Sequence, residues 1–94
     1  MNKEEYKAKA AKTIDEVSAK INELKAKKES AKDDVKSDYE QSLKTLEEKK
    51  SEIQAKYDDL KVATDDKWDE AKNAFSSASN SFKDGISKIS SLFS

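Results

Sequence analysis

Pairs of adjacent acidic residues recur along this chain. Both general acid–base catalysis and calcium binding use carboxylate groups that lie close together. Catalysis needs a carboxylate in an enclosed site that shifts its pKa, and a calcium loop needs acids at fixed spacing around a central glycine. That glycine-centred spacing is absent here, and Lys residues follow the acids three or four positions away, as on a solvated helix face. We therefore predict neither a catalytic nor a metal site from Asp33-Asp34, Glu47-Glu48, Asp58-Asp59, Asp65-Asp66 or Asp69-Glu70.

Several residue types that carry chemistry are missing from the sequence. There is no His and no Cys, which excludes zinc sites, haem ligation, disulfides and catalysis by imidazole or thiol. All 19 basic residues are Lys, and the net charge is −1. Because Arg provides the bidentate contacts that favour phosphates and base edges, this composition argues against nucleic-acid binding. We predict a non-enzymatic protein without cofactor, metal ion, nucleic acid or small-molecule substrate.

The balance of charged and apolar residues limits the kind of core that 94 residues can form. Charged residues make up 41% of the chain and hydrophobic residues 34%. This balance is too polar for a wide core, but a seam between helices needs only two or three apolar positions per seven. Dense charge also marks disordered chains. The small net charge and the regular phase of the apolar residues favour a folded or self-associated helix over a disordered monomer.

The phase of the apolar residues indicates one fold class, all-α. Proline is absent and Gly85 is the only glycine, so the strongest breakers of local structure are missing from most of the chain. Apolar residues recur three or four apart, as in one stripe of a helix. We predict one long amphipathic helix from about residue 3 to 80 or beyond, self-associating as an antiparallel coiled coil. Its seam would comprise Ile14, Val17, Ile21, Leu24, Val35, Leu43, Leu46, Ile53, Tyr57 and Leu60.

A helical hairpin is the alternative arrangement. The stripe has an approximate mirror about Tyr39, so an antiparallel pairing matches apolar with apolar positions, within one chain or between two. The best candidate turn lies near residues 36–40. A second, weaker candidate for a break is residues 63–66, where Asp65 and Asp66 would suit the first turn of a new helix. Because neither candidate has glycine or proline, a helix that runs straight through both is favoured.

The C-terminal part differs from the rest in composition. We divide the chain into a charged coiled-coil body, residues 1–67, and a Ser-rich amphipathic helix, residues 68–94, continuous with it. The second segment has large apolar residues on one face and a weakly charged face opposite, as in helices that bind lipid surfaces. That face could instead pack on another helix of the protein or in a partner's groove. Its members are Trp68, Phe75, Phe82, Ile86, Ile89 and Phe93.

Three segments resemble a known family. Residues 2–9 (NKEEYKAK), 21–27 (INELKAK) and 68–72 (WDEAK) are similar to a family of small bacterial coiled-coil proteins known as stress-response proteins. The resemblance implies a bacterial, soluble, all-helical protein without known enzymatic activity, and it assigns no site residues. A weaker similarity is to late-embryogenesis-abundant and apolipoprotein-like helices, which implies protection of membranes or proteins under water stress.

These observations lead to two hypotheses about function. The first is a structural or stress-associated coiled-coil protein that acts by self-association as a homo-oligomer. The second is a peripheral binder of membrane or lipid surfaces through residues 68–94. The N-terminal residues are polar, without the apolar core of a signal peptide, and no stretch approaches the roughly 18 apolar residues that span a bilayer. A cytoplasmic protein, with or without peripheral membrane contact, is therefore expected.

Overall fold

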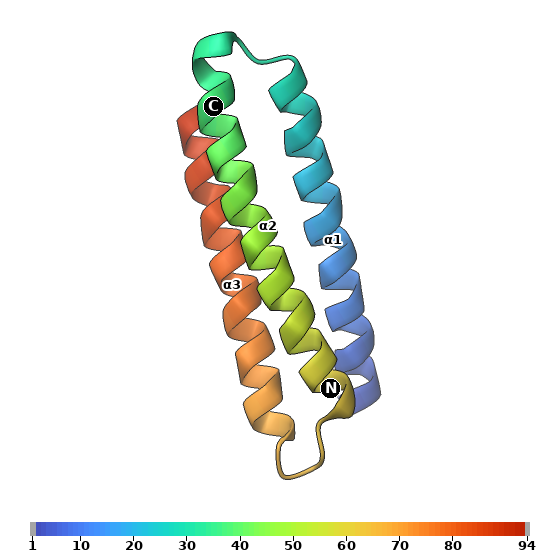
Figure 1. Ribbon diagram of the computed structural model, residues 1–94. Helices are drawn as coiled ribbons and strands as arrows, with labels where there is room; N and C mark the ends of the chain where they lie inside the picture. The colour runs from blue at the N-terminus through green and yellow to red at the C-terminus, as the bar shows by residue number, and fades with distance from the viewer. Residues whose placement is uncertain (1, 94) are drawn as a thin grey trace.

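Three antiparallel helices form a single elongated bundle (Figure 1). The computed structural model describes residues 2–93, and the side chains of residues 2–89. Helix α1 spans Lys3–Glu29, α2 spans Asp33–Val62 and α3 spans Trp68–Phe93, and they alternate in direction. Both outer helices pack mainly on α2 and touch each other much less. The bundle measures 51 × 18 × 17 Å, so its core is long and narrow. The predicted all-α class and antiparallel packing are confirmed.

The ends of α1 follow from its local sequence. The Asn2 side chain accepts a hydrogen bond from the backbone N–H of Glu5 at 2.8 Å, which satisfies one of the free donors of the first turn. Acidic residues in the first turn and Lys27 and Lys28 in the last complement the helix dipole. At the C-terminal end, the N–H of Ser30 donates to the carbonyl of Lys27 at 3.2 Å.

The chain turns earlier than the sequence predicts, so the unbroken helix from residue 3 to 80 is wrong. Residues 36–40, the predicted site of a hairpin turn, lie inside α2, and the turn comprises residues 30–32. Ser30 keeps a near-helical backbone (φ −94°, ψ −3°), and Lys32 is extended (φ −68°, ψ 152°). Because neither conformation requires glycine or proline, the turn leaves no strong mark in the sequence.

A second turn, residues 63–67, separates α2 from α3. Ala63 is extended, the Thr64 hydroxyl donates to the Asp66 carboxylate, and the N–H of Lys67 donates to the carbonyl of Thr64 at 3.0 Å. The chain thus breaks at the weaker of the two candidate positions, where an unbroken helix had been favoured. We had expected the C-terminal helix to continue the helix of the body; instead α3 begins after the turn and folds back along α2.

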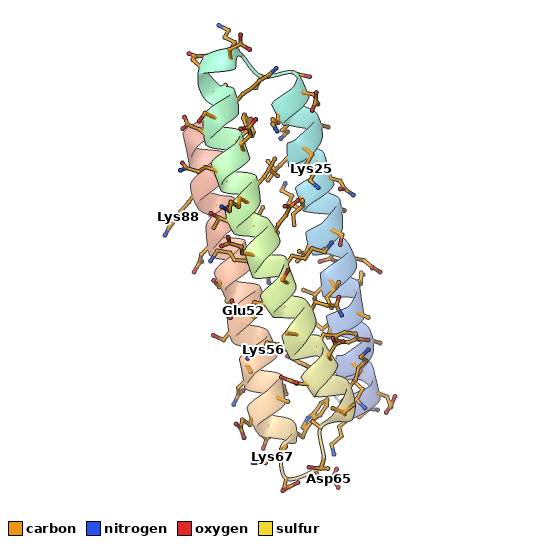
Figure 2. The ribbon with its side chains drawn as sticks, in the orientation of Figure 1. Lys25, Glu52, Lys56, Asp65, Lys67 and Lys88 are labelled. Atoms are coloured by element: carbon orange, nitrogen blue, oxygen red, sulfur yellow. The ribbon has the colours of Figure 1, made fainter. Side chains whose placement is uncertain are left out.

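The core is one continuous cluster with contributions from all three helices. The apolar stripe of each helix faces the bundle axis, and charged side chains such as Glu52, Lys56 and Lys88 project outward (Figure 2). Leu46, Ile53 and Leu60 on α2 are 0% exposed. Their complete burial places α2 at the centre of the packing.

Replacing Leu46 with Ala should lower the free energy of unfolding by about 2–5 kcal/mol, because it leaves a cavity where both outer helices pack. Urea denaturation followed by circular dichroism measures this change. The control is Glu48→Ala, at an exposed position two residues further along α2. It should change stability by less than about 0.5 kcal/mol. Equal effects of the two substitutions would contradict the assigned core.

Candidate functional site

The residues predicted to form a seam between chains lie in the core of one chain. Three of them, Ile14, Val35 and Tyr57, are half-buried and packed against the core cluster. The seam is therefore covered without a second copy, and the burial argument for an oligomer no longer applies. The remaining seam residues are buried: Val17, Ile21, Leu24, Leu43, Leu46, Ile53 and Leu60.

The apolar face of α3 is also turned inward. Phe75, Phe82 and Ile89 are buried, and Trp68 and Ile86 are half-buried against the same cluster. Phe93, the last member predicted for this face, lies outside the residues whose side chains are described. In this closed form the face meets other helices of the same chain. Contact with a lipid surface through these residues therefore requires α3 to leave the bundle.

An aromatic cluster at one end of the bundle joins α3 to α1. The Tyr6 ring meets Trp68 edge-on at 5.8 Å between centroids and Phe75 at 6.4 Å. Its hydroxyl donates to the carbonyl of Lys72 at 3.3 Å, and burial raises the pKa of the phenol. The Lys3 ammonium lies 5.6 Å from the Trp68 ring, in cation–π range. Tyr6 was not among the residues predicted to form the stripe, although its spacing from Ala10 and Ile14 extends it.

Among the described residues, the ion pairs between helices join α1 to α2, and none joins α3 to either of them. Lys25 pairs with Glu47 at 2.9 Å, and Lys28 pairs with Glu40 at 3.3 Å. A further pair between Lys3 and Asp65 ties α1 to the second turn. Exposed pairs of this kind each contribute at most about 1 kcal/mol, but they fix the register of the α1–α2 hairpin.

The packing of α3 on α2 has a different character. Across this interface Lys49 donates a hydrogen bond to the hydroxyl of Ser81 at 2.7 Å. The buried apolar side chains of α3, among them Phe82 and Ile89, belong to the same core cluster as those of α2. Gly85 lies against α2, where an added Cβ would stand 3.3 Å from Leu46. The absence of a side chain thus allows close approach of the two helices, although glycine weakens a helix by about 0.5–1 kcal/mol relative to alanine.

Ser79 is a second weak point of α3. It is 9% exposed, and its buried hydroxyl oxygen has no hydrogen-bond partner. A buried polar group without a partner costs about 1–3 kcal/mol. Ser79 was not predicted to be buried, because it is one of many serines in this helix and the sequence does not indicate which of them faces the core. Its position one residue after Ala78 in the apolar stripe was the only available clue.

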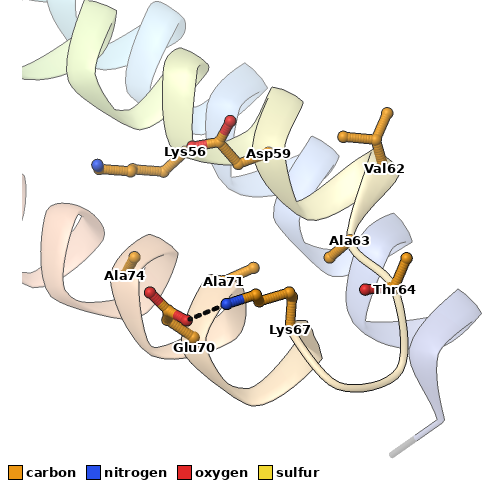
Figure 3. A pocket seen from close by; sticks show the side chains of 9 residues that line it. All are labelled: Lys56, Asp59, Val62, Ala63, Thr64, Lys67, Glu70, Ala71 and Ala74. Atoms are coloured by element: carbon orange, nitrogen blue, oxygen red, sulfur yellow. Dashed lines mark ion pairs between the residues drawn. The ribbon is translucent and has the colours of Figure 1, made fainter.

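The surface hollows of the bundle are open and shallow. The hollow beside the second turn has a volume of about 420 Å³ and lies between α2 and α3 (Figure 3). Lys67 and Glu70 form an ion pair there at 3.8 Å, and Val62 on its edge is 79% exposed. A groove of about 340 Å³ runs between α1 and α3, with Val17, Phe82 and Ile86 among its walls. Neither hollow gathers groups arranged for catalysis.

The described residues form neither a metal-binding group nor a membrane-spanning helix. None of their Asp or Glu residues gather in groups of three or more that could hold a metal ion. None of their helices has the length and apolar character needed to cross a bilayer. Comparison with family models, with curated proteins and with solved structures found no match to this chain. The candidate site is therefore defined by geometry alone, as the inward face of α3 and the joints that hold it.

Replacing Ser79 with Ala should raise the free energy of unfolding by about 1 kcal/mol, since it removes the unpartnered hydroxyl. Urea denaturation measures the change, and Ser76→Ala on the exposed face is the matched control. The control should gain only the few tenths of a kcal/mol due to helix propensity. A lower free energy of unfolding for Ser79→Ala would contradict this prediction, because it would show that the hydroxyl stabilises the bundle.

Proposed function

We propose that this protein is a non-enzymatic binding protein that releases α3 from the bundle and lays its apolar face on a lipid surface. One observation carries the proposal: α3 has a face of large apolar residues, and among the residues with described side chains it is apolar packing, not ion pairs, that holds this helix to the other two. The unpartnered hydroxyl of Ser79 weakens the closed position further.

The free energies are consistent with opening at a surface and closure in water. Burial of each large apolar side chain is worth about 1.5–3 kcal/mol. Exposing Phe75, Phe82 and Ile89 to water together would cost an amount comparable with the whole stability of a small domain. At a lipid surface the same side chains leave water again, so most of that cost is recovered.

The polar face of α3 indicates which kind of surface it would prefer. Helix α3 has three Lys and three acidic residues, so its charges cancel. A neutral helix gains little from anionic headgroups, and its binding would depend on the insertion of apolar side chains. We therefore expect a preference for highly curved, loosely packed membranes. The exposed polar positions include Asn73, Ser76, Ser77, Asn80 and Ser87.

The other hypothesis, a stress-associated protein that acts by self-association, stays a prediction, as does a cytoplasmic location. The stress role is supported by the resemblance of residues 2–9, 21–27 and 68–72 to a family. In the closed bundle the expected seam is covered within one chain. Self-association through the same residues would require an exchange of helices between copies.

The lipid proposal is tested by flotation with phosphatidylcholine vesicles. The protein should float with small sonicated vesicles and much less with large extruded ones. A Lys49→Cys, Ser81→Cys variant allows α3 to be tied to α2 by a short bis-maleimide bridge, because these side chains meet across the interface and the chain has no other Cys. Bridging should abolish flotation, since α3 can no longer leave.

The matched control is the same double variant with each thiol capped separately, which should float like the wild type. Circular dichroism of the bridged protein checks that the bundle remains folded. Flotation of the bridged variant at the level of the capped one, or no flotation of the wild type, would refute the proposed release of α3.

A further inference from the structure

The residues of the turn between α1 and α2 could also form part of a continuous helix. Its three residues, Ser30, Ala31 and Lys32, include neither glycine nor proline, and none of the described residues outside glycine has a positive φ. Ser30 is already near-helical, and the N-cap position of α2, Lys32, makes no side-chain capping hydrogen bond. The second turn, in contrast, has a hydrogen bond between Thr64 and Asp66. Few interactions therefore specify a bend at residues 30–32.

The apolar pattern continues through this turn without a change of phase. Steps of three and four residues lead from α1 through the turn into α2. The positions are Leu24, the half-buried Lys28, Ala31, Val35 and Tyr39. Ala31 and Val35 are half-buried against the core. If the turn became helical, these positions would form one uninterrupted stripe across the joint.

From this we infer that the α1–α2 turn is a hinge, and that two copies of the chain exchange α1 when it straightens. Each copy would then have one continuous helix over residues 3–62, and its α1 would pack on α2 and α3 of the other copy. The partner surface is the one that α1 covers in the closed bundle. Exchange of an identical element is a low-cost route to a dimer, because the contacts already exist within the monomer.

The ion pairs of the closed bundle show where two such chains would cross. The pairs Lys28–Glu40 and Lys25–Glu47 have their midpoints at residues 34 and 36. If the same pairs form between two antiparallel copies, the two-fold axis passes close to Val35. Its side chain would meet the Val35 side chain of the second copy, and the ion pairs would be kept in the same register.

Straightening also supplies hydrogen bonds that the closed turn lacks. Each helix end leaves up to four backbone groups without partners inside the helix, and a continuous helix pairs them across the joint. The opposing cost is the entropy lost when two chains associate, so the exchanged dimer is favoured at high protein concentration. The exchange leaves α3 on its own α2, so this inference goes beyond the proposed release of α3.

The test replaces Lys32 with Pro, and Lys32→Ala is the matched control. Proline suits the closed turn, because the φ of Lys32 is −68° and proline fixes φ near −65°. It opposes the straight form, where it would stand inside a helix. Each protein is refolded from urea at high concentration and then measured by size-exclusion chromatography with light scattering and by small-angle X-ray scattering.

We expect wild type and Lys32→Ala to yield a dimer about 90 Å long, the length of a 60-residue helix, against 51 Å for the closed bundle. Lys32→Pro should remain a compact monomer, with its dimer dissociation constant raised at least about a hundredfold. Monomeric wild type and Lys32→Ala after refolding, or a Lys32→Pro protein that dimerises as readily as Lys32→Ala, would overturn the inference.

A second variant checks the crossing point without depending on proline. Val35→Cys places a single thiol near the predicted two-fold axis, since the chain has no Cys of its own. Mild oxidation should join two chains when this substitution is combined with Lys32→Ala, and should not when it is combined with Lys32→Pro. Equal cross-linking in both backgrounds would refute the exchange. Unchanged circular dichroism and vesicle flotation of Lys32→Pro would show that this protein is folded and that α3 release is a separate property.

Discussion

Packing of both outer helices on the apolar stripe of α2 is the constraint on which the rest of the structure depends. A chain with 41% charged residues has too few apolar side chains for more than one stripe on each helix. The three stripes therefore have to meet along a common axis, and the side chains at their centre, Leu46, Ile53 and Leu60, are fully buried. The narrow bundle of 51 × 18 × 17 Å follows from this composition. Because α1 and α3 each rest mainly on α2, each can be displaced while the other keeps its main contacts.

Polar interactions make the two joints of the bundle unequal. The pairs Lys25–Glu47 and Lys28–Glu40 set the register of α1 against α2. Helix α3 is held mainly by its apolar face, with hydrogen bonds to Tyr6 and Lys49 and a weak point at the unpartnered Ser79. The first joint favours exchange between copies, because the same ion pairs can form with a second chain. The second favours transfer of α3 to another apolar environment, where few specific polar contacts are lost. The two proposals thus depend on different residues and can fail independently.

Local pattern was enough to predict the fold class and most of the core. The three- and four-residue spacing identified the buried apolar side chains from Val17 to Ile89, and residues 63–66 were recognised as a weak candidate for the second turn. The first turn was missed because Ser30, Ala31 and Lys32 are all compatible with a helix, so the fold is decided there by packing of α1 on α2 rather than by local preference. The mirror axis was placed at Tyr39, whereas the ion pairs centre on residues 34 to 36, since a pattern of threes and fours nearly repeats when shifted by one helical turn.

The character of the candidate site was harder to predict than its members. Phe75, Phe82 and Ile89 were recognised as one face, but a sequence does not tell whether such a face meets lipid, a partner or the rest of its own chain. The covered state of the face, the contact of Tyr6 with Trp68 and the missing partner of Ser79 depend on three-dimensional packing between distant segments. The missing partner of Ser79 favours release of α3 from the bundle, whereas the contact of Tyr6 with Trp68 opposes it.

Native-state hydrogen exchange resolved along the chain tests this central claim most directly. If α3 is the least firmly held helix, its slowest amides should exchange through an opening that costs clearly less free energy than the opening of α1 and α2. The slowest amides of α1 and α2 should have higher values, and those of α2 should equal the free energy of global unfolding. The same free energy of opening for the slowest amides of all three helices would contradict the account, because the bundle would then open only as a whole.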